Sequence, residues 1–279
     1  MVFGVASVTL VMAALDFGRL RAWIAGALLL GAGAFLPQVP SQCADVPLAC
    51  FIVATLAVAC RPNGLLPDPE SPYPSALIAG AMSALAAWTK NEGLAFALLM
   101  LSLVAIVALR RGRGRRLLWW VAGGAPVFIT LVWFKLALAP SSSLFEGQSP
   151  GIYVDRLFDL DRHQVVTTLM ARHMVRWGAP LAGAAIPLVG LTAAWLAVVR
   201  GGAGMRLMLA VVALMFAVYY TVYLTTPFDL TWHISTSVDR LLAQLWPLLV
   251  LTAFLTDRPT SDLNPGPPRG GPFLPGPTT

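Results

Sequence analysis

Nine apolar stretches follow one another along the chain, separated by short polar segments. They lie at residues 2–15, 22–38, 46–60, 74–89, 93–109, 117–139, 179–199, 207–225 and 241–256. Their apolar residues are continuous rather than alternating, which predicts helices and excludes the strands of a membrane β-barrel. A helix needs ~20 residues to cross ~30 Å of hydrocarbon. Several stretches are shorter, and we expect these to be buried among neighbouring helices or to thin the membrane locally.

The composition agrees with this pattern. Hydrophobic residues make up 57% of the 279 residues and charged residues 11%, whereas soluble domains contain ~25% charged residues. The net charge of +6 does not indicate nucleic-acid binding, because five arginines lie in one loop, RRGRGRR at 110–116. Three cysteines without a paired spacing predict neither a disulfide framework nor a metal site. We therefore predict an all-α protein, a polytopic transmembrane helical bundle of about nine spans in the inner or plasma membrane.

Basic loops predict the orientation of these spans, because cytoplasmic loops are enriched in Lys and Arg. The loop at 110–116 is expected in the cytoplasm. Alternation then places three other basic loops on the same side, those at Arg19 and Arg21, at Arg61, and at 200–206. The extracytoplasmic face receives Asp45, the turn at 90–92, and the segments 140–178 and 225–240. Ionisable groups at membrane depth are costly and usually functional, so we expect the active face there.

The ends of the chain carry two further expectations. Alternation places Met1 outside with no leader sequence, as expected of a chain that has lost a preceding span. Residues 257–279 are rich in Pro and Gly and are predicted to form a disordered cytoplasmic tail.

Asp45 stands at the mouth of an apolar segment and is followed by Pro47, a residue suited to the first turn of a helix. One interpretation is a helix N-cap, a position that Asp favours. The other, compatible with it, is an acidic group directed at a polar substrate at the membrane surface.

Lys90 and Glu92 interrupt the apolar sequence AAWTKNEGLAFA. In a structural interpretation they close a tight hairpin and satisfy each other, or extend outward from helix ends. In a functional one, Lys90 contacts a phosphate as a point charge. Glu92 then orients Lys90 or contacts a sugar hydroxyl.

The segment 150–177 combines apolar residues at helical spacing with arginines and histidines between them. This pattern predicts a broken amphipathic helix that lies in the membrane interface with a basic polar face. It serves either as a lipid-headgroup anchor or as part of the site. His163 and His173 are ten residues apart and do not lie on adjacent helical turns, which argues against a metal site.

The stretch TTPFDLTWHISTSVDRLLAQLWP is the richest in polar groups. Pro227 and Asp229 predict a turn and N-cap. In the helix that follows, one face carries His233, Ser237, Arg240 and Gln244, with Trp232 and Asp239 beside it. Such a stripe must face protein or a watery cavity. It either fixes helix packing through Asp239 and Arg240, or presents Arg240 to a phosphate or carboxylate.

Together these residues predict one pocket on the extracytoplasmic face, formed by Asp45, Lys90 and Arg240 from distant parts of the chain. Cations suit a phosphate leaving group, carboxylates suit activation of a hydroxyl, and Trp suits a sugar face. The sequence contains no nucleotide-binding loop, so a lipid-linked donor is expected. No metal or other cofactor is indicated.

Three segments carry a resemblance to a known family: CADVPLACF, AWTKNEGLAF and YLTTPFDLTWHISTSVDRLLAQLWP. Over residues 1–256 the chain resembles bacterial membrane glycosyltransferases of the GT-C superfamily. Within that superfamily it most resembles the branch of dolichyl-phosphate-mannose–protein mannosyltransferase-like enzymes, which contain the RgtA/B/C/D-like domain. The resemblance implies transfer of a sugar from a polyprenyl-phosphate carrier to a lipid, glycan or protein acceptor.

In that family an acidic residue in the first outer loop is the expected base, and one in the next outer loop assists it. Asp45 matches the second residue, and Lys90 matches a basic residue near the carrier phosphate. We therefore predict Asp45 and Glu92 as catalytic residues. The predicted substrate-binding residues are Lys90, Asp229, Trp232, His233, Asp239 and Arg240.

The first span and first acidic loop of the family have no counterpart in this sequence, so the chain is expected to be a fragment or inactive alone. The alternative function is a permease or flippase-like carrier for an anionic substrate. A carrier should place charges near the bilayer midplane and repeat interrupted helices in both halves. The charges here gather at one face, which favours the transferase.

Overall fold

The computed structural model describes residues 1–16, 18–40, 43–61, 64–65, 73–139, 149–177, 185–199 and 202–255. The tail predicted at 257–279 lies outside these ranges. Nine helices match the nine apolar stretches: α1 (Val2–Ala14), α2 (Leu20–Gly31), α3 (Asp45–Ala59), α4 (Tyr73–Thr89), α5 (Asn91–Arg110), α6 (Gly114–Ala137), α9 (Ala185–Val199), α10 (Ala203–Thr225) and α11 (Leu230–Phe254). The prediction of a helical bundle is confirmed.

Four of these helices are long and apolar enough to cross a membrane, namely α5, α6, α10 and α11. The other apolar helices are shorter, and α3 shows why short helices are tolerated here. Most of its residues are buried in the protein, so neighbouring helices rather than lipid cover it. The helical composition is that of a membrane protein, while the full count of nine spans stays a prediction.

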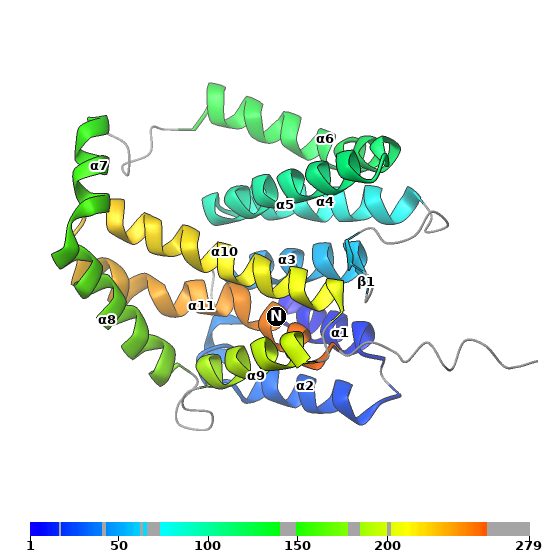
Figure 1. Cartoon of the computed structure of the whole chain (residues 1–279), viewed down its shortest axis with the longest axis horizontal. Helices are drawn as coiled ribbons and strands as arrows, with labels where there is room; N and C mark the ends of the chain where they lie inside the picture. Colours follow the sequence, from blue (N-terminus) through cyan, green and yellow to red (C-terminus); the bar gives the residue numbers. More distant parts are fainter. Residues whose placement is uncertain are drawn as a thin grey trace, which may run out of the picture.

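The bundle is built around α3, α10 and α11 (Figure 1). Helices α4, α5 and α6 lie above them in this view, and α1, α2 and α9 lie below. Helix α11 is almost wholly enclosed over its second half, where Trp246 is fully buried. Because it packs against α1, α2, α3, α8, α9 and α10, α11 carries its polar residues into the centre of the bundle.

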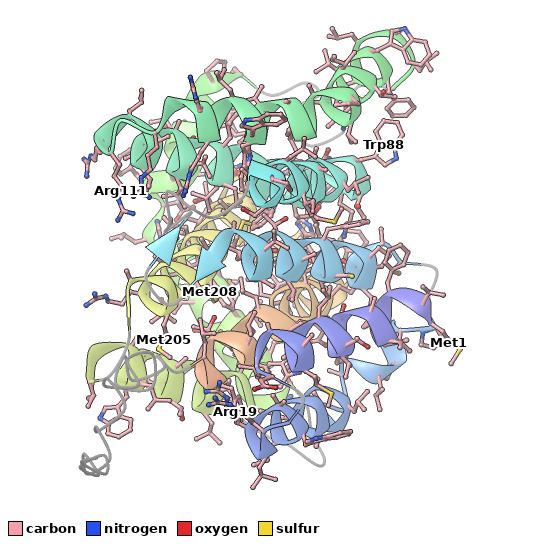
Figure 2. The ribbon with its side chains drawn as sticks, turned by 90° about the vertical axis from the view of Figure 1, so that its right-hand side faces the viewer. Met1, Arg19, Trp88, Arg111, Met205 and Met208 are labelled. Carbon is pink, nitrogen blue, oxygen red and sulfur yellow. The ribbon has the colours of Figure 1, made fainter. Side chains whose placement is uncertain are left out.

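The basic loops gather at one end of the molecule. Figure 2 shows Arg19, Arg111 and Met205 toward one side and Met1 and Trp88 toward the other. This grouping is the one that the alternation of spans predicts. We call the second end, which carries the α4–α5 turn and the start of α11, the site end. Which end faces the cytoplasm stays a prediction.

The departure from an all-α fold among the described residues is a minimal antiparallel pair, β1 (Cys60–Arg61) and β2 (Gly64–Leu65). Cys60 is paired with Leu65 and Arg61 with Gly64. The two strands have two residues each, so the pair does not alter the fold class.

The predicted amphipathic segment forms two helices, α7 (Pro150–Phe158) and α8 (Leu160–Arg176), which cross the site end of the bundle (Figure 1). The break occurs at Asp159, whose Oδ1 accepts hydrogen bonds from the backbone N–H groups of Asp161 (3.0 Å) and Arg162 (3.3 Å). Asp159 therefore caps α8, as short acidic side chains commonly do. The placement of this segment in a membrane interface stays a prediction.

Two arginines of α7 and α8 bind the C-terminal end of α10. Arg156 donates to the carbonyl of Thr225 (2.8 Å), and Arg162 donates to those of Leu224 (2.9 Å) and Thr226 (3.1 Å). A helix C-terminus has unpaired carbonyls and partial negative charge, so these cations hold α7 and α8 against the bundle. Burial lowers the pKa of Arg162 and Arg156 lowers it further, whereas Asp159 raises it.

His163 also serves the packing of α8. Its Nε2 lies 2.9 Å from the carbonyl oxygen of Leu157, and its Nδ1 lies 2.8 Å from the Tyr220 hydroxyl. In the neutral ring Nε2 must therefore donate to the carbonyl, and Nδ1 accepts from the hydroxyl. Nε2 thus joins α8 to α7, and Nδ1 joins α8 to α10.

Candidate functional site

A fully buried carboxylate joins three separate parts of the chain. Asp45, the first residue of α3, has a side-chain exposure of 0%. Lys90 Nζ donates to its Oδ1 at 2.7 Å and Arg240 Nε donates to its Oδ2 at 2.8 Å. Gln244 Nε2 donates to Oδ1 at 2.6 Å. The structure thus brings together Asp45, Lys90 and Arg240, the three residues predicted to share a pocket.

Glu92 completes this group, which we call the Asp45 cluster: Asp45, Lys90, Glu92, Arg240 and Gln244. Glu92 Oε1 lies 3.3 Å from Lys90 Nζ. Two carboxylates therefore face two cations. A buried charge is strongly unfavourable unless it is paired and hydrogen-bonded, and here three donors favour the ionised form of Asp45.

The sequence explains the convergence in local terms. Arg240 and Gln244 are four residues apart on α11 and so lie on one face of the helix. The Gln244 amide is oriented by Tyr219, whose hydroxyl donates to Gln244 Oε1 at 2.8 Å. This bond fixes the oxygen of the amide toward Tyr219 and leaves its NH₂ group for Asp45.

The structural interpretations of Asp45 and of the Lys90–Glu92 pair have different outcomes. The N-cap of α3 is Ala44, and no side chain caps that helix, so the interpretation of Asp45 as a cap is wrong. The reason is that its carboxylate is fully occupied by side chains of α11 and by Lys90. The Lys90–Glu92 pair does form, but Lys90 makes its shorter contact with Asp45.

The other predicted residues bind elsewhere. Asp239 accepts a hydrogen bond from His173 Nδ1 at 3.1 Å, which joins α11 to α8. His233 Nδ1 lies 2.9 Å from the Thr226 hydroxyl, and Trp232 is exposed beside Phe228. Trp232 and His233 lie in the first turn of α11, and the predicted roles of all three residues in substrate binding stay predictions.

Asp229 is the N-cap of α11, as predicted, because its Oδ1 accepts from the backbone N–H of Trp232 at 2.8 Å. Asp229→Ala should therefore destabilise the protein by about 1 kcal/mol, the usual loss for an N-cap. Thermal unfolding in detergent would measure this. Asp229→Ser should recover most of the loss, and an equal loss in both variants would contradict the capping role.

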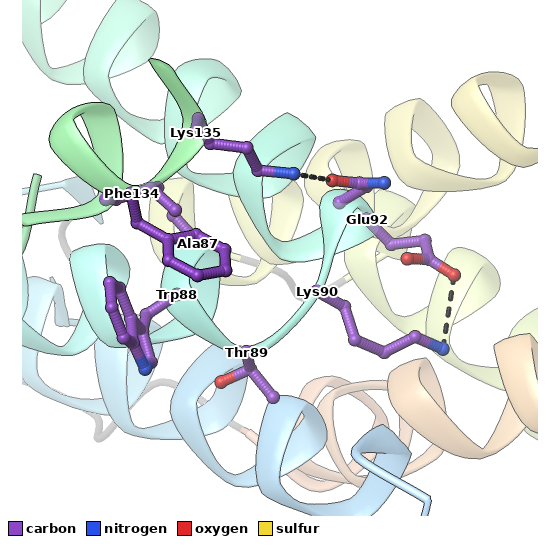
Figure 3. A pocket seen from close by; sticks show the side chains of 9 residues that line it. Ala87, Trp88, Thr89, Lys90, Glu92, Phe134 and Lys135 are labelled. Carbon is purple, nitrogen blue, oxygen red and sulfur yellow. Dashed lines mark hydrogen bonds and ion pairs between the residues drawn. The ribbon is translucent and has the colours of Figure 1, made fainter. Parts of the chain in front are cut away.

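A pocket of about 440 Å³ opens next to the Asp45 cluster. Its lining comes from α4, from Lys90 and the start of α5, and from α6: Ala87, Trp88, Thr89, Lys90, Asn91, Glu92, Leu131, Phe134 and Lys135. Lys135 donates to Asn91 Oδ1 at 2.8 Å, and Figure 3 shows Glu92 turned toward Lys90. The rings of Trp88 and Phe134 lie 5.9 Å apart on the wall. The pocket thus combines two lysines, a carboxylate and an aromatic pair.

Sequence reasoning assigned no role to Trp88, Asn91, Lys135 or Tyr219. Lys135 carried a usable signal, because it is a charged residue inside the apolar stretch 117–139. Asn91 and Tyr219 carried none, since a single amide or hydroxyl in an apolar helix is common and only the tertiary contacts give it a partner.

Comparison of the chain with protein-family models, curated proteins and solved structures finds no match. The assignment of function therefore depends on the geometry of the Asp45 cluster and its pocket.

Proposed function

We propose that this chain is an integral membrane glycosyltransferase that takes a sugar from a polyprenyl-phosphate carrier. The observation that carries the proposal is the Asp45 cluster itself. A buried carboxylate holds a lysine and an arginine beside a pocket at the site end of an apolar helical bundle. Fixed cations next to a carboxylate are the groups that phosphate departure and hydroxyl activation require. The resemblance to the GT-C superfamily supports the same reaction.

Glu92 is the better placed of the two predicted catalytic carboxylates. It lines the pocket and its side chain is 27% exposed, whereas Asp45 has no exposed surface. We assign to Glu92 the contact with the acceptor hydroxyl. Asp45 then acts as a positioning residue that holds both cations.

The cations suit the carrier phosphate. Lys90 lines the pocket, and Arg240 uses only Nε to bind Asp45, with its side chain 38% exposed. Its two Nη atoms have no hydrogen-bond partner among the described residues and are available to an anion. A planar guanidinium beside an ammonium is a strong arrangement for phosphate oxygens.

The reaction follows from these positions. The acceptor hydroxyl oxygen bonds to the anomeric carbon of the sugar while its proton passes to Glu92. The bond between that carbon and the phosphate oxygen breaks, and its electron pair leaves with the polyprenyl phosphate. Lys90 and Arg240 stabilise the charge that develops on the leaving phosphate.

Binding of polyprenyl phosphate by the full chain in nanodiscs tests the proposal without requiring turnover. Lys90→Ala and Arg240→Ala should each weaken binding about 10–100-fold, the value of one charged hydrogen bond. Arg111→Ala at the opposite end should bind as the wild type does. Unchanged affinity in both site variants would assign Lys90 and Arg240 to structure alone.

Cleavage of the lipid-linked sugar distinguishes the transferase from the carrier. With a radiolabelled polyprenyl-phosphate sugar, a transferase releases polyprenyl phosphate, and Glu92→Gln should slow that release. A carrier moves the intact lipid-linked sugar between leaflets, and such movement without bond cleavage would contradict the proposal.

A further inference from the structure

Both lysines of the chain line the same pocket. Lys90 and Lys135 are the two lysines in the sequence, and every other permanently cationic side chain is an arginine. Lys90 comes from the α4–α5 turn and Lys135 from the last turn of α6. Lysine presents a compact point charge on a flexible stem, which suits an anion bound at the edge of a pocket.

The two lysines differ in how their charge is balanced. Lys90 faces two carboxylates, those of Asp45 and Glu92. Lys135 Nζ donates to the neutral Asn91 Oδ1 at 2.8 Å, and within the described ranges it has no carboxylate partner. The pocket therefore carries an unbalanced positive charge on its α6 side.

The position of Lys135 differs from that of a lysine that only extends to water. Such a side chain leaves the helix end and ends in solvent. Lys135 is instead held by Asn91, a residue of α5, and lines the pocket together with Phe134 (Figure 3). Asn91 thus fixes the ammonium group over the pocket.

The pocket lies next to an exposed apolar surface. Trp88 and Phe134 are both exposed, and so are Trp133 and Leu136 on the last turns of α6. In a bilayer, exposed aromatic residues near the end of a span lie at the headgroup level. The geometry fits a molecule with an anionic head at Lys135 and an apolar chain along Trp88 and Phe134.

We infer that this pocket binds the anionic headgroup of a lipid acceptor and that Lys135 is its recognition residue. The inference rests on the proposed function, in which Lys90 and Arg240 are used by the donor phosphate. Lys135 is then left for a second anion. Of the three acceptor classes, lipid, glycan and protein, a pocket with Lys135 in this position therefore favours an anionic membrane lipid.

The test uses the full chain in nanodiscs of phosphatidylcholine, with phosphatidic acid as the anionic lipid probe and native mass spectrometry as the readout. Lys135→Ala and Lys135→Gln should weaken phosphatidic acid binding about tenfold. Lys135→Arg should retain most of it, and Arg111→Ala should match the wild type. Inorganic phosphate at the same concentration should not displace the lipid.

Wild-type affinity in Lys135→Gln would overturn the inference. So would displacement of the lipid by inorganic phosphate, which would indicate a site for soluble anions. Transfer assays separate it from the proposed function. Transfer that Lys135→Gln leaves unchanged with both anionic and neutral lipid acceptors would reject Lys135 and keep the transferase. Binding that depends on Lys135 without any transfer would keep the lipid site and reject the acceptor role.

Discussion

Replacing Asp45 with alanine is expected to destabilise the folded protein by about 3–5 kcal/mol, the loss typical of removing one partner from a buried ion pair. Asp45 is the fully buried anion to which Lys90, Arg240 and Gln244 all donate. Without it, Lys90 and Arg240 face each other with less negative charge between them. Reversible unfolding in detergent micelles, followed by far-UV circular dichroism, would measure the loss.

Asp45→Asn separates the charge from the shape of the side chain. The amide retains one oxygen acceptor and nearly the same volume, so it should fold better than Asp45→Ala. It removes the negative charge that holds both cations, so binding of polyprenyl phosphate should fall much more than expression does. A variant with normal expression and normal phosphate binding would remove Asp45 from the site.

Asp239→Asn is the control for the loss of stability. Asp239 is also an acidic residue with a hydrogen-bonded partner, His173, but its side chain is 48% exposed. Exposed pairs contribute ~0–1 kcal/mol. Asp45→Ala should therefore be clearly less stable than Asp239→Asn, and equal stabilities would show that the Asp45 cluster contributes little to the fold.

The sequence predicted the helices well because their cause is local. Continuous apolar segments have no alternative in lipid but to satisfy their backbone groups within a helix. The N-cap at Asp229 follows from the local turn and capping signal of Pro227 and Asp229. The shared face of Arg240 and Gln244 follows from the 3.6-residue period. The break at Asp159 was anticipated only as a discontinuity somewhere in 150–177.

The partners of the polar residues could not be predicted in the same way. Asp45 looked like a helix cap because sequence shows only its own helix, and its real donors lie 45, 195 and 199 residues away. Asp239 and Arg240 are adjacent in sequence, yet they point to different elements, Asp239 to α8 and Arg240 to α3. Lys135 was overlooked because the apolar residues around it were sufficient to predict a membrane span, so its charge was not considered separately.

The close packing of α4 on α6 links the fold to the pocket. Gly80 on α4 and Gly123 on α6 lie at the crossing, where a Cβ added at either would overlap the opposite backbone carbonyl, that of Trp120 or Leu77. Small residues allow such close approach between membrane helices. Trp88 and Lys90 lie at and just beyond the end of α4, and Phe134 and Lys135 lie near the end of α6, so this spacing sets the width of the pocket.

Gly123→Leu is therefore expected to cost at least about 3 kcal/mol, the upper part of the usual range for overpacking, because the obstructing atoms are backbone. The helices must separate, and phosphatidic acid binding at the pocket should fall together with thermal stability. Gly114→Leu is the control on the same helix. No atom lies within 4 Å of a Cβ added at Gly114, so this variant should be neutral or slightly stabilised by the better helix propensity of leucine. If Gly123→Leu were as stable as Gly114→Leu and still bound the lipid, the contact between α4 and α6 would not be what holds the pocket walls in place.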